Sequence, residues 1–432
     1  MSYKTLVGYY LKSSTCTVIL MLVLQLQTLV QAQVSIGFER DRTKNILKKV
    51  SKTIRDKFYD PKFHGLDWEK LTDQASRDIE NASSAREMVR IIFALVHELQ
   101  DSHTVFIPPS FATKIFWGFE AQAFGEKIFV HEIAKDSAAA DSGLAVGDRL
   151  WKIGSFKAER STLDLLLLHL RYLQPVVSMD VTFTRGGGAA RIARVQSKIK
   201  RQSFVTDLTR VHNIYDLIRE AESDEMTFYY DFDEKSGIGY LRIPSLDVDK
   251  GFLSKLVKKI KKSRATIVDL RGNPGGAIES LYHFSGFFES QPTVIAQLVG
   301  RKKTEPLKAK PRKPSLAGTM FILVGSRTAS AAEVFARHFQ LRGQAVVIGD
   351  RSAGRVTVSR VFPYQEGIDR IVPYAVQVAT SQRVFPDGEQ LEKKGVIPDQ
   401  QCIPNAEDLR GEADKVSVVG LRDGTQGPWR VR

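Results

Sequence analysis

Residues 320–340 read MFILVGSRTASAAEVFARHFQ, and this stretch says most about the fold. The apolar run before Gly325 is typical of a buried strand, and the residues after Ser330 have the spacing of an amphipathic helix. Ser330 thus lies among small residues where a strand passes into a helix. A hydroxyl at a helix N-terminus faces unpaired backbone N–H groups, which stabilise negative charge developing on an attacked carbonyl. An ordinary helix cap is the alternative interpretation, and Ser326 and Thr328 are rival caps.

The segments around this stretch alternate between strand and helix patterns. They are GIGYLRIPSL from Gly237, FLSKLVKKIKK from Phe252, ATIVDLRGNPGG from Ala265 and AVVIGD from Ala345. This alternation favours an α/β layer with parallel strands. We therefore expect an α/β domain at residues 205–410, followed by a polar tail at residues 411–432.

A glycine-rich turn, Asp-Leu-Arg-Gly-Asn-Pro-Gly-Gly, occupies residues 269–276 at the end of one predicted strand. Paired glycines let backbone N–H groups approach a ligand closely and point the same way. Together with the N–H of Ala331, this turn suits an oxyanion hole. An ordinary glycine turn is the alternative.

Two further regions precede the α/β domain. Residues 38–104 show helical periodicity, as in AREMVRIIFALVHELQ after the predicted cap Ser84, and end in a polar turn around His103. Residues 112–200 contain short strand patterns, such as EKIFVHEI and MDVTFTR, and one apolar helical stretch, LDLLLLHLRYL. We expect a small helical domain followed by a compact β-rich module.

The composition is that of a globular protein of two or three domains. The chain has 432 residues, of which 43% are hydrophobic and 26% charged, which argues against a disordered, collagen-like or multi-spanning membrane protein. Only Cys16 and Cys402 occur, so a disulfide framework or a thiolate zinc cluster is excluded. We expect no metal ion.

The charge balance is basic. With 63 Lys and Arg against 49 Asp and Glu, the net charge is +14, so nucleic acids and anionic membranes must be considered as partners. The basic runs at residues 255–262 and 301–313 lack interleaved stacking aromatics. A solvated helix face and a surface loop explain these runs better, and no nucleic-acid partner is expected.

Residues 1–32 have the pattern of a secretory signal peptide. Lys4 and Lys12 are present without any acid, and an apolar run ends at Val30 and the small residue Ala32. This pattern predicts export to the periplasm or the extracellular space. The alternative is an uncleaved anchor that would keep the protein near a membrane, although the run is short for a span.

The motifs resemble those of the tail-specific, or carboxyl-terminal processing, serine proteases. The resemblance rests on D-L-R-G-N-P-G-G and on the later T-A-S-A-A-E, and it extends over nearly the whole mature chain. It implies a crotonase-like α/β core of repeated β-β-α units. It also implies that Ser330 is the nucleophile, that Gly275 and Ala331 form the oxyanion hole, and that no cofactor is needed.

The middle region resembles a PDZ domain. Phe116-Trp117-Gly118-Phe119 is similar to the carboxylate-binding loop of PDZ domains, and residues 136–154 are similar to their helix-turn-strand signature. A PDZ groove binds an extended peptide by strand addition. The resemblance implies an inserted PDZ domain at residues 112–200, in which Trp117, Gly118 and Phe119 engage substrate tails. A PDZ fold that is only scaffolding is the alternative.

The residue that activates Ser330 depends on the branch of the family. One branch uses a lysine after a downstream glycine, but this chain has Arg355 there, and a guanidinium cannot accept a proton. The other branch, which includes the tricorn core protease, uses Ser-His-Glu. Leu-Gln-Asp-Ser-His-Thr at residues 99–104 resembles its histidine turn, which implies that His103 is the base. Glu392, shortly before Gly-Val-Ile-Pro-Asp, is then the residue that orients the imidazole.

Each of these two residues has a rival nearby. His97 lies one helical turn before His103, but on a regular helix rather than in a turn. Glu389 lies further than Glu392 from the Gly-Val-Ile-Pro-Asp stretch.

We therefore predict a serine endopeptidase that cleaves unfolded or C-terminally tagged proteins and peptides through an acyl-enzyme. A second hypothesis, motivated by Arg355, is a peptide-binding scaffold that has lost hydrolysis. A third is apolar-ligand binding, because the family resembles the retinoid-binding repeats of the eye. Dependence of the function on Ser330 separates the first hypothesis from the second, and a co-purified lipid-like ligand would support the third.

Overall fold

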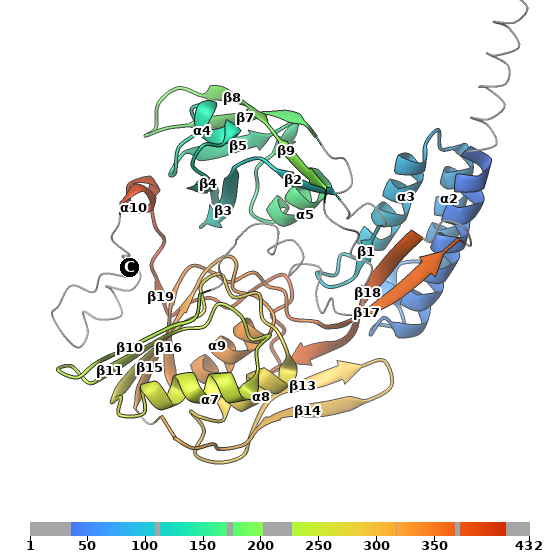
Figure 1. The fold of residues 1–432 in the computed structure, drawn as a ribbon. Helices are drawn as coiled ribbons and strands as arrows, with labels where there is room; N and C mark the ends of the chain where they lie inside the picture. Colours follow the sequence, from blue (N-terminus) through green and yellow to red (C-terminus); the bar gives the residue numbers. More distant parts are fainter. Residues whose placement is uncertain are drawn as a thin grey trace, which may run out of the picture.

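The computed structural model describes residues 36–108, 113–170, 176–201, 227–316, 318–367 and 372–411. The predicted signal peptide and nearly all of the predicted polar tail lie outside these ranges. Figure 1 shows three regions: a helical region, a β-rich inserted module (residues 113–170 and 176–201), and an α/β layer. Within the described ranges, no helix combines the length and the apolar character that a membrane span requires.

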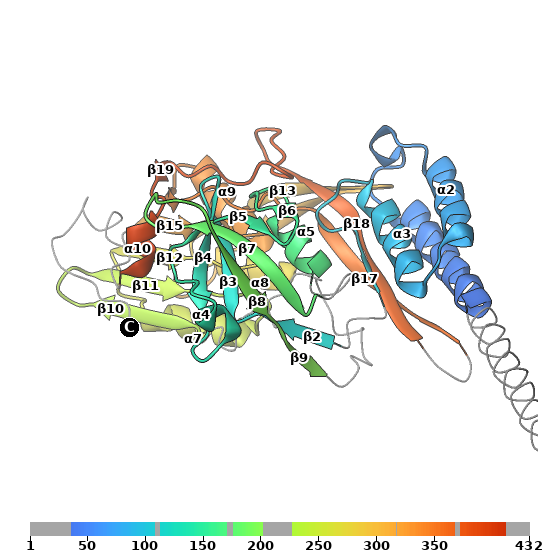
Figure 2. The ribbon, with the colours of Figure 1, turned by 90° about the horizontal axis from the view of Figure 1, so that it is seen from above.

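The helical region contains helical residues 36–57, η1 (Phe63–Gly65), α2 (Trp68–Asn81) and α3 (Ala85–His97). Ser84 caps α3 as predicted, since its side chain accepts a hydrogen bond from the N–H of Glu87. β1 (Val105–Ile107) follows and pairs with β18 (Val372–Val384), which lies beside β17 (Val358–Glu366). Figure 2 shows β17 and β18 running from the α/β layer toward α2 and α3. Because β1 pairs with β18, the His103 turn before β1 lies close to C-terminal segments.

The inserted module is an antiparallel sheet with its own apolar core. Its strand order is β3-β4-β5-β7-β8, so β3 lies at one end of the sheet. α5 packs with this core, and a separate pair, β2 with β9, forms the base of the module. The elements are β2 (Thr113–Phe116), β3 (Phe119–Phe124), β4 (Lys127–Ile133), α4 (Ala138–Asp141), β5 (Arg149–Ile153), β6 (Phe156–Lys157), α5 (Leu163–Leu168), β7 (Ser178–Thr184), β8 (Arg191–Gln196) and β9 (Lys198–Arg201).

The α/β layer has the strand order β10-β11-β12-β15-β16-β19, and every pair is parallel except β10 with β11. This confirms the predicted mixed α/β class. Its elements are β10 (Tyr229–Asp233), β11 (Ile238–Arg242), α7 (Lys250–Lys259), β12 (Ala265–Asp269), α8 (Ile278–Ser285), β15 (Thr319–Val324), α9 (Ala331–Leu341), β16 (Ala345–Gly349) and β19 (Gln400–Gln401). β13 (Thr293–Gly300) and β14 (Thr304–Ala309) join β1, β17 and β18 in a second sheet, and α10 (Ala406–Arg410) ends the described chain.

Candidate active site

Ser330 and the glycine turn meet at one edge of the α/β sheet. β12 and β15 are parallel neighbours, with Asp269 paired to Leu323, so the turn after β12 lies beside the loop that leads to Ser330. A Cβ atom built on Gly275 would lie 2.7 Å from the Cβ of Ser330 and 2.8 Å from the N of Ala331. A larger residue at position 275 would collide with Ser330, which explains the glycine.

Ser330 occupies the position before α9 with an unusual backbone. Its φ is 54° and its ψ is −120°, and only 9% of its surface is exposed. The two rival caps have other partners: Ser326 Oγ donates to the carbonyl of Ala123 in the inserted module, and Thr328 Oγ1 donates to the carbonyl of Leu270. Ser330 is therefore the residue at the N-cap position.

Asn273 organises the glycine turn. Its Nδ2 donates to the carbonyl of Ile243 over 2.7 Å, and its own carbonyl accepts the N–H of Ala329 over 2.8 Å. Its Oδ1 accepts the N–H of Gly275 over 2.7 Å. The Gly275 N–H is thus already engaged, and a substrate oxygen would have to compete with this side chain for it.

Glu333 lies on the first turn of α9 and is fully buried. Its Oε2 accepts the N–H groups of Ser330 and Arg355, each over 2.9 Å, and its Oε1 accepts Ser352 Oγ and the N–H of Gly354, each over 2.6 Å. Burial raises the pKa of Glu333 to about 6, against the lowering effect of these hydrogen bonds. The carboxylate ties the Ser330 turn to residues 350–357, here called the bridging segment.

The bridging segment also reaches the His103 turn. Glu392 Oε2 accepts the N–H of Val356 over 2.9 Å and that of Thr357 over 3.4 Å, while its Oε1 accepts the N–H of Ser102 over 3.1 Å. The Oγ of Ser102 lies 2.9 Å from Nδ1 of His103. Glu392 therefore holds the backbone of the turn that carries the imidazole of His103, and the hydroxyl of Ser102 contacts the ring.

Burial and local charge shift two pKa values in this turn. Burial, reinforced by the positive charges of Arg383 and Arg355, lowers the pKa of His103 to about 3, so the imidazole is neutral near pH 7. Burial, reinforced by the negative charge of Glu392, raises the pKa of Asp101 to about 7. The Oδ1 of Asp101 accepts the N–H of His103, whereas its buried Oδ2 has no hydrogen-bond partner among the residues that the structure describes.

The two rival residues have different surroundings. Glu389 lies 2.6 Å from the guanidinium of Arg337, and its carboxylate is about one-third exposed. His97 ends α3, where its Nε2 lies 3.4 Å from the side-chain nitrogen of Gln100. These contacts favour Glu392 over Glu389, because Glu392 binds both the His103 turn and the bridging segment.

The sequence interpretation missed three residues of this cluster. Ser102 lies in the histidine turn, but a serine there carries no local signal of a contact with the imidazole. Glu333 follows Ser330 by three residues, the capping-box spacing, and this spacing was the available signal. Arg383 is 3% exposed and lies near the C-terminal end of β18, where nothing in its local sequence marks it.

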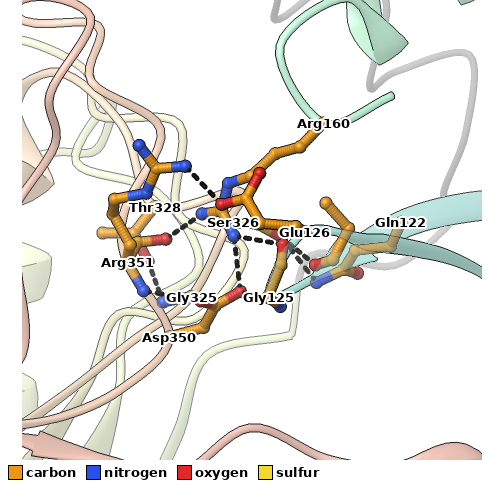
Figure 3. A network of polar contacts seen from close by, with 10 residues as sticks. Gln122, Gly125, Glu126, Arg160, Gly325, Ser326, Thr328, Asp350 and Arg351 are labelled. Atoms are coloured by element: carbon orange, nitrogen blue, oxygen red, sulfur yellow. Dashed lines mark hydrogen bonds and ion pairs between the residues drawn. The ribbon is translucent and has the colours of Figure 1, made fainter. Parts of the chain in front are cut away.

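The inserted module contacts the bridging segment through a polar network, shown in Figure 3. Arg160 Nη1 donates to Asp350 Oδ2 over 2.8 Å and to the carbonyl of Gly125 over 2.7 Å. Gly125 in turn donates its N–H to Asp350 Oδ2, and Arg351 pairs with Glu126 over 2.8 Å. Beside this network, Arg355 forms an ion pair with Asp164 of α5.

The free edge of β3 faces the loop before Ser330. The carbonyl of Ala121 accepts a hydrogen bond from Arg327 over 3.0 Å, and that of Ala123 accepts one from Ser326 over 2.5 Å. A cavity of about 360 Å³ adjoins this contact. Its walls come from α3, β3, α5, the His103 turn and the bridging segment, and include Phe93, Val96, Phe106, Gln122, Leu163, Leu168, Ser352 and Arg355.

The three residues of the predicted carboxylate-binding loop lie inside the module. Trp117 and Phe119 are 2% and 5% exposed and belong to the module core. Gly118 has φ +80°, and a Cβ there would lie 2.3 Å from the Cβ of Ser137, which caps α4. The side chains of this loop are thus structural, and only its backbone is left for binding a ligand. Within the described ranges, no group of three or more His, Cys, Asp or Glu is arranged to hold a metal ion.

Comparison with known proteins identifies the family. The profile of Peptidase family S41 matches residues 237–402, which include the glycine turn, Ser330 and Glu392, and that of the Tricorn protease C1 domain matches residues 40–96. Residues 237–402 form a domain of peptidase family S41. Carboxyl-terminal-processing peptidase 1, chloroplastic, from Arabidopsis thaliana is 20% identical over 394 residues, covering 87% of this chain and 75% of the relative. The carboxy-terminal processing protease CtpA of Bacillus subtilis is 23% identical over 353 residues, covering 78% and 68%.

Other relatives are matched over less of their length. The probable CtpA-like serine protease of Staphylococcus epidermidis is 25% identical over 65% of this chain but only 52% of its own. Among solved structures, mature CPAF has a TM-score of 0.64 at 14% identity, covering 86% of this chain and 94% of that one. The photosystem II D1 C-terminal processing protease has a TM-score of 0.53 at 17% identity, covering 84% and 94%. These structures show a shared fold. The S41 chain is accordingly a serine peptidase of the carboxyl-terminal processing type, as its motifs predicted.

Proposed function

We propose that this S41 chain hydrolyses peptide bonds with Ser330 as the nucleophile and His103 as the general base. The observation that carries the proposal is the bridging segment, which is hydrogen-bonded to the Ser330 turn at one end and to Glu392 at the other. The N–H of Ser330 donates to the carbonyl of Arg355 over 2.7 Å, and Val356 follows directly with its N–H on Glu392. Three segments far apart in the sequence thus share one continuous set of contacts.

The proposed reaction assigns one role to each of these groups. Nε2 of His103 takes the proton of Ser330 Oγ as that oxygen bonds to the scissile carbonyl carbon. Nδ1–H then donates to Ser102 Oγ, which fixes the tautomer, and Glu392 holds Ser102 through its backbone N–H. His103 passes the proton to the leaving amine, and water, deprotonated in the same way, hydrolyses the acyl-enzyme.

The oxyanion hole is assigned to the N–H groups of Ala331 and Gly275. The Ala331 N–H lies at the N-terminus of α9, where the helix dipole favours negative charge. The Gly275 N–H becomes available when the developing oxyanion replaces the neutral Oδ1 of Asn273 as its acceptor. A charged acceptor forms the stronger hydrogen bond, so the exchange favours the transition state.

The substrates are assigned as unfolded or C-terminally tagged proteins, and the inserted module is assigned as a PDZ domain that binds their tails. Strand addition at the free edge of β3 would require a tail to displace Arg327 and Ser326 from the carbonyls of Ala121 and Ala123. The crotonase-like core and the domain boundaries given above belong to the same proposal. Export through residues 1–32 also belongs to it.

The pairing of Arg355 with Asp164 bears on the hypothesis of an inactive scaffold. An ion pair with α5 gives this arginine a structural role, so its presence at the lysine position does not require that hydrolysis be lost.

Digestion of an unfolded substrate tests the proposal. We expect the purified chain to degrade casein, with Ser330→Ala inactive under the same conditions and folded by circular dichroism. Equal degradation by both proteins, or none by the unaltered chain, would overturn it.

A further inference from the structure

We propose that Glu333 is a positioning residue for the nucleophile: its carboxylate fixes the Ser330 turn and the bridging segment in one relative geometry. This inference rests on the proposed role of Ser330. It assigns to Glu333 a task beyond capping α9.

The distribution of donors separates the two tasks. A capping-box glutamate serves the backbone N–H of the N-cap residue, and Glu333 does so for Ser330. Its three other donors, Ser352, Gly354 and Arg355, all belong to the bridging segment. Most of the hydrogen bonds of this carboxylate therefore serve a segment that is distant in the sequence.

The cost of burying this carboxylate makes a chance arrangement improbable. Glu333 is fully buried, and in the described part of the chain no Lys, Arg or His lies within ion-pair distance of it. Four hydrogen bonds compensate for the lost hydration, together with the positive charge of the buried Arg383 guanidinium nearby. Because hydrogen bonds are directional, four of them fix the positions of their donors more narrowly than a single ion pair would.

The backbone of Ser330 needs such support. A φ of 54° with a ψ of −120° is sparsely populated for a residue with a side chain, and it persists only where the surroundings determine it strongly. The N–H of Ser330 has two acceptors, Glu333 Oε2 and the carbonyl of Arg355, and Glu333 also holds the N–H of Arg355 itself. Loss of the carboxylate would remove the first acceptor and also release the N–H of Arg355, whose carbonyl is the second acceptor.

A direct chemical role for Glu333 is excluded by the same contacts. Both of its oxygens are engaged and none of its surface is exposed, so it cannot reach a substrate. It must act through Ser330 and the bridging segment.

The test compares Glu333→Gln with Glu289→Gln in the full chain. The side-chain amide of Gln has one carbonyl oxygen and one NH2 group. The NH2 group would face two of the four donors, so about half of the hydrogen bonds would be lost. Glu289 is the matched control because it is also buried in the α/β domain, where it lies 2.6 Å from Nε2 of His338, but it contacts neither Ser330 nor the bridging segment. The measurements are kcat and KM on an unfolded peptide and the rate of labelling by a fluorophosphonate probe, both per folded molecule.

We expect Glu333→Gln to lower kcat and the labelling rate about 100-fold with KM changed less than about threefold, because a displaced nucleophile impairs chemistry more than binding. Glu289→Gln is expected to lose thermal stability but to keep the labelling rate. A folded Glu333→Gln chain that is labelled within about twofold of the unaltered rate would overturn the inference.

Two further variants distinguish failure of the inference from failure of the proposed function. If Glu333→Gln fails to fold, Glu333→Asp decides: it keeps a carboxylate but shortens its reach, so a lower kcat at unchanged KM supports the inference and an unaltered kcat overturns it. Ser330→Ala shows whether labelling reports the proposed nucleophile. If the unaltered chain and Ser330→Ala behave alike, the proposed function fails, and that failure is recognised without any variant of Glu333.

Discussion

The two sides of the bridging segment are held by different kinds of contact. On the side of α9, Glu333 is fully buried and binds three backbone N–H groups and one hydroxyl. On the side of the inserted module, three of the contacts are ion pairs between charged side chains: Arg160 with Asp350, Arg351 with Glu126, and Arg355 with Asp164. The exposure of these pairs varies widely, since Arg160 is 9% exposed and Glu126 is 77% exposed.

We call the side of α9 the fixed side and the side of the inserted module the separable side. Hydrogen bonds to a buried carboxylate are little affected by salt and hold a precise geometry, whereas exposed ion pairs are screened and contribute little. We therefore expect the Ser330 turn to keep its shape when single ion pairs of the module are removed.

The largest effect is expected on the fixed side, at the reacting groups. Ser330→Ala and His103→Ala should each lower kcat at least about 1000-fold, because residues that act as a unit lose most of the catalysis when one is removed. The double variant should be no worse than either single one. Peptide hydrolysis by the three proteins checks this, and additive losses would show that the two residues do not act together.

On the separable side, Arg160→Ala should cost about 3 kcal/mol of stability, because it removes the cation from a buried pair. Arg351→Ala, at an exposed pair, should cost less than about 1 kcal/mol. Urea unfolding measures both values. Fluorophosphonate labelling of Ser330 should be unchanged in both variants, and a large loss of labelling in Arg160→Ala would contradict the independence of the two sides.

A further prediction on the fixed side concerns the contact between Ser102 and the imidazole of His103. Ser102→Ala should lower kcat about 10- to 100-fold, because the imidazole loses the partner that orients it, and Ser102→Thr should restore most of the activity by keeping a hydroxyl. The variants are compared by their pH–rate profiles. An unaltered rate in Ser102→Ala would mean that Glu392 orients the ring by another route.

The last prediction concerns the stability of the fold and depends on pH through Asp101. Its pKa is raised from 3.8 to about 7 by burial and by Glu392, so the folded chain retains a proton that the unfolded chain loses above about pH 4. The stabilising contribution of this carboxyl is therefore complete below about pH 4 and lost as the pH rises through 7. Asp101→Asn imitates the protonated form.

This variant should match the unaltered chain in stability near pH 4 and exceed it by about 4 kcal/mol at pH 8, the free energy that corresponds to a pKa raised from 3.8 to about 7. Urea unfolding at the two pH values makes the comparison, and Asp56→Asn, at an exposed carboxylate on residues 36–57, serves as the control. A stability difference that does not change with pH would contradict the assignment.

The sequence predicted the parts of this molecule that depend on local pattern. The apolar runs before Gly275 and Ser330 have the length of buried strands, and parallel pairing brings their C-terminal ends to one edge, so the meeting of the two turns could be anticipated. The region from Ser84 to His97 likewise forms the helix that its spacing predicted. The roles of His103 and Glu392 came from resemblance alone.

Contacts between distant segments could not be predicted in the same way. Arg160 and Asp350 lie 190 residues apart, one in the inserted module and the other directly after β16 of the α/β layer. No local sequence pattern around either residue indicates its partner. Arg383 is an ordinary residue of a strand by pattern, although its side chain is buried beside Glu392 and Glu333. Such pairs form only when whole domains pack together, and the hydrophobic periodicity of the sequence does not indicate how they pack.

The most direct test of the central claim is to locate the fluorophosphonate adduct by peptide mass spectrometry. We predict a single adduct on Ser330, strongly reduced in His103→Ala and unchanged in Arg351→Ala. An adduct on another serine, or labelling that persists in Ser330→Ala, would contradict it.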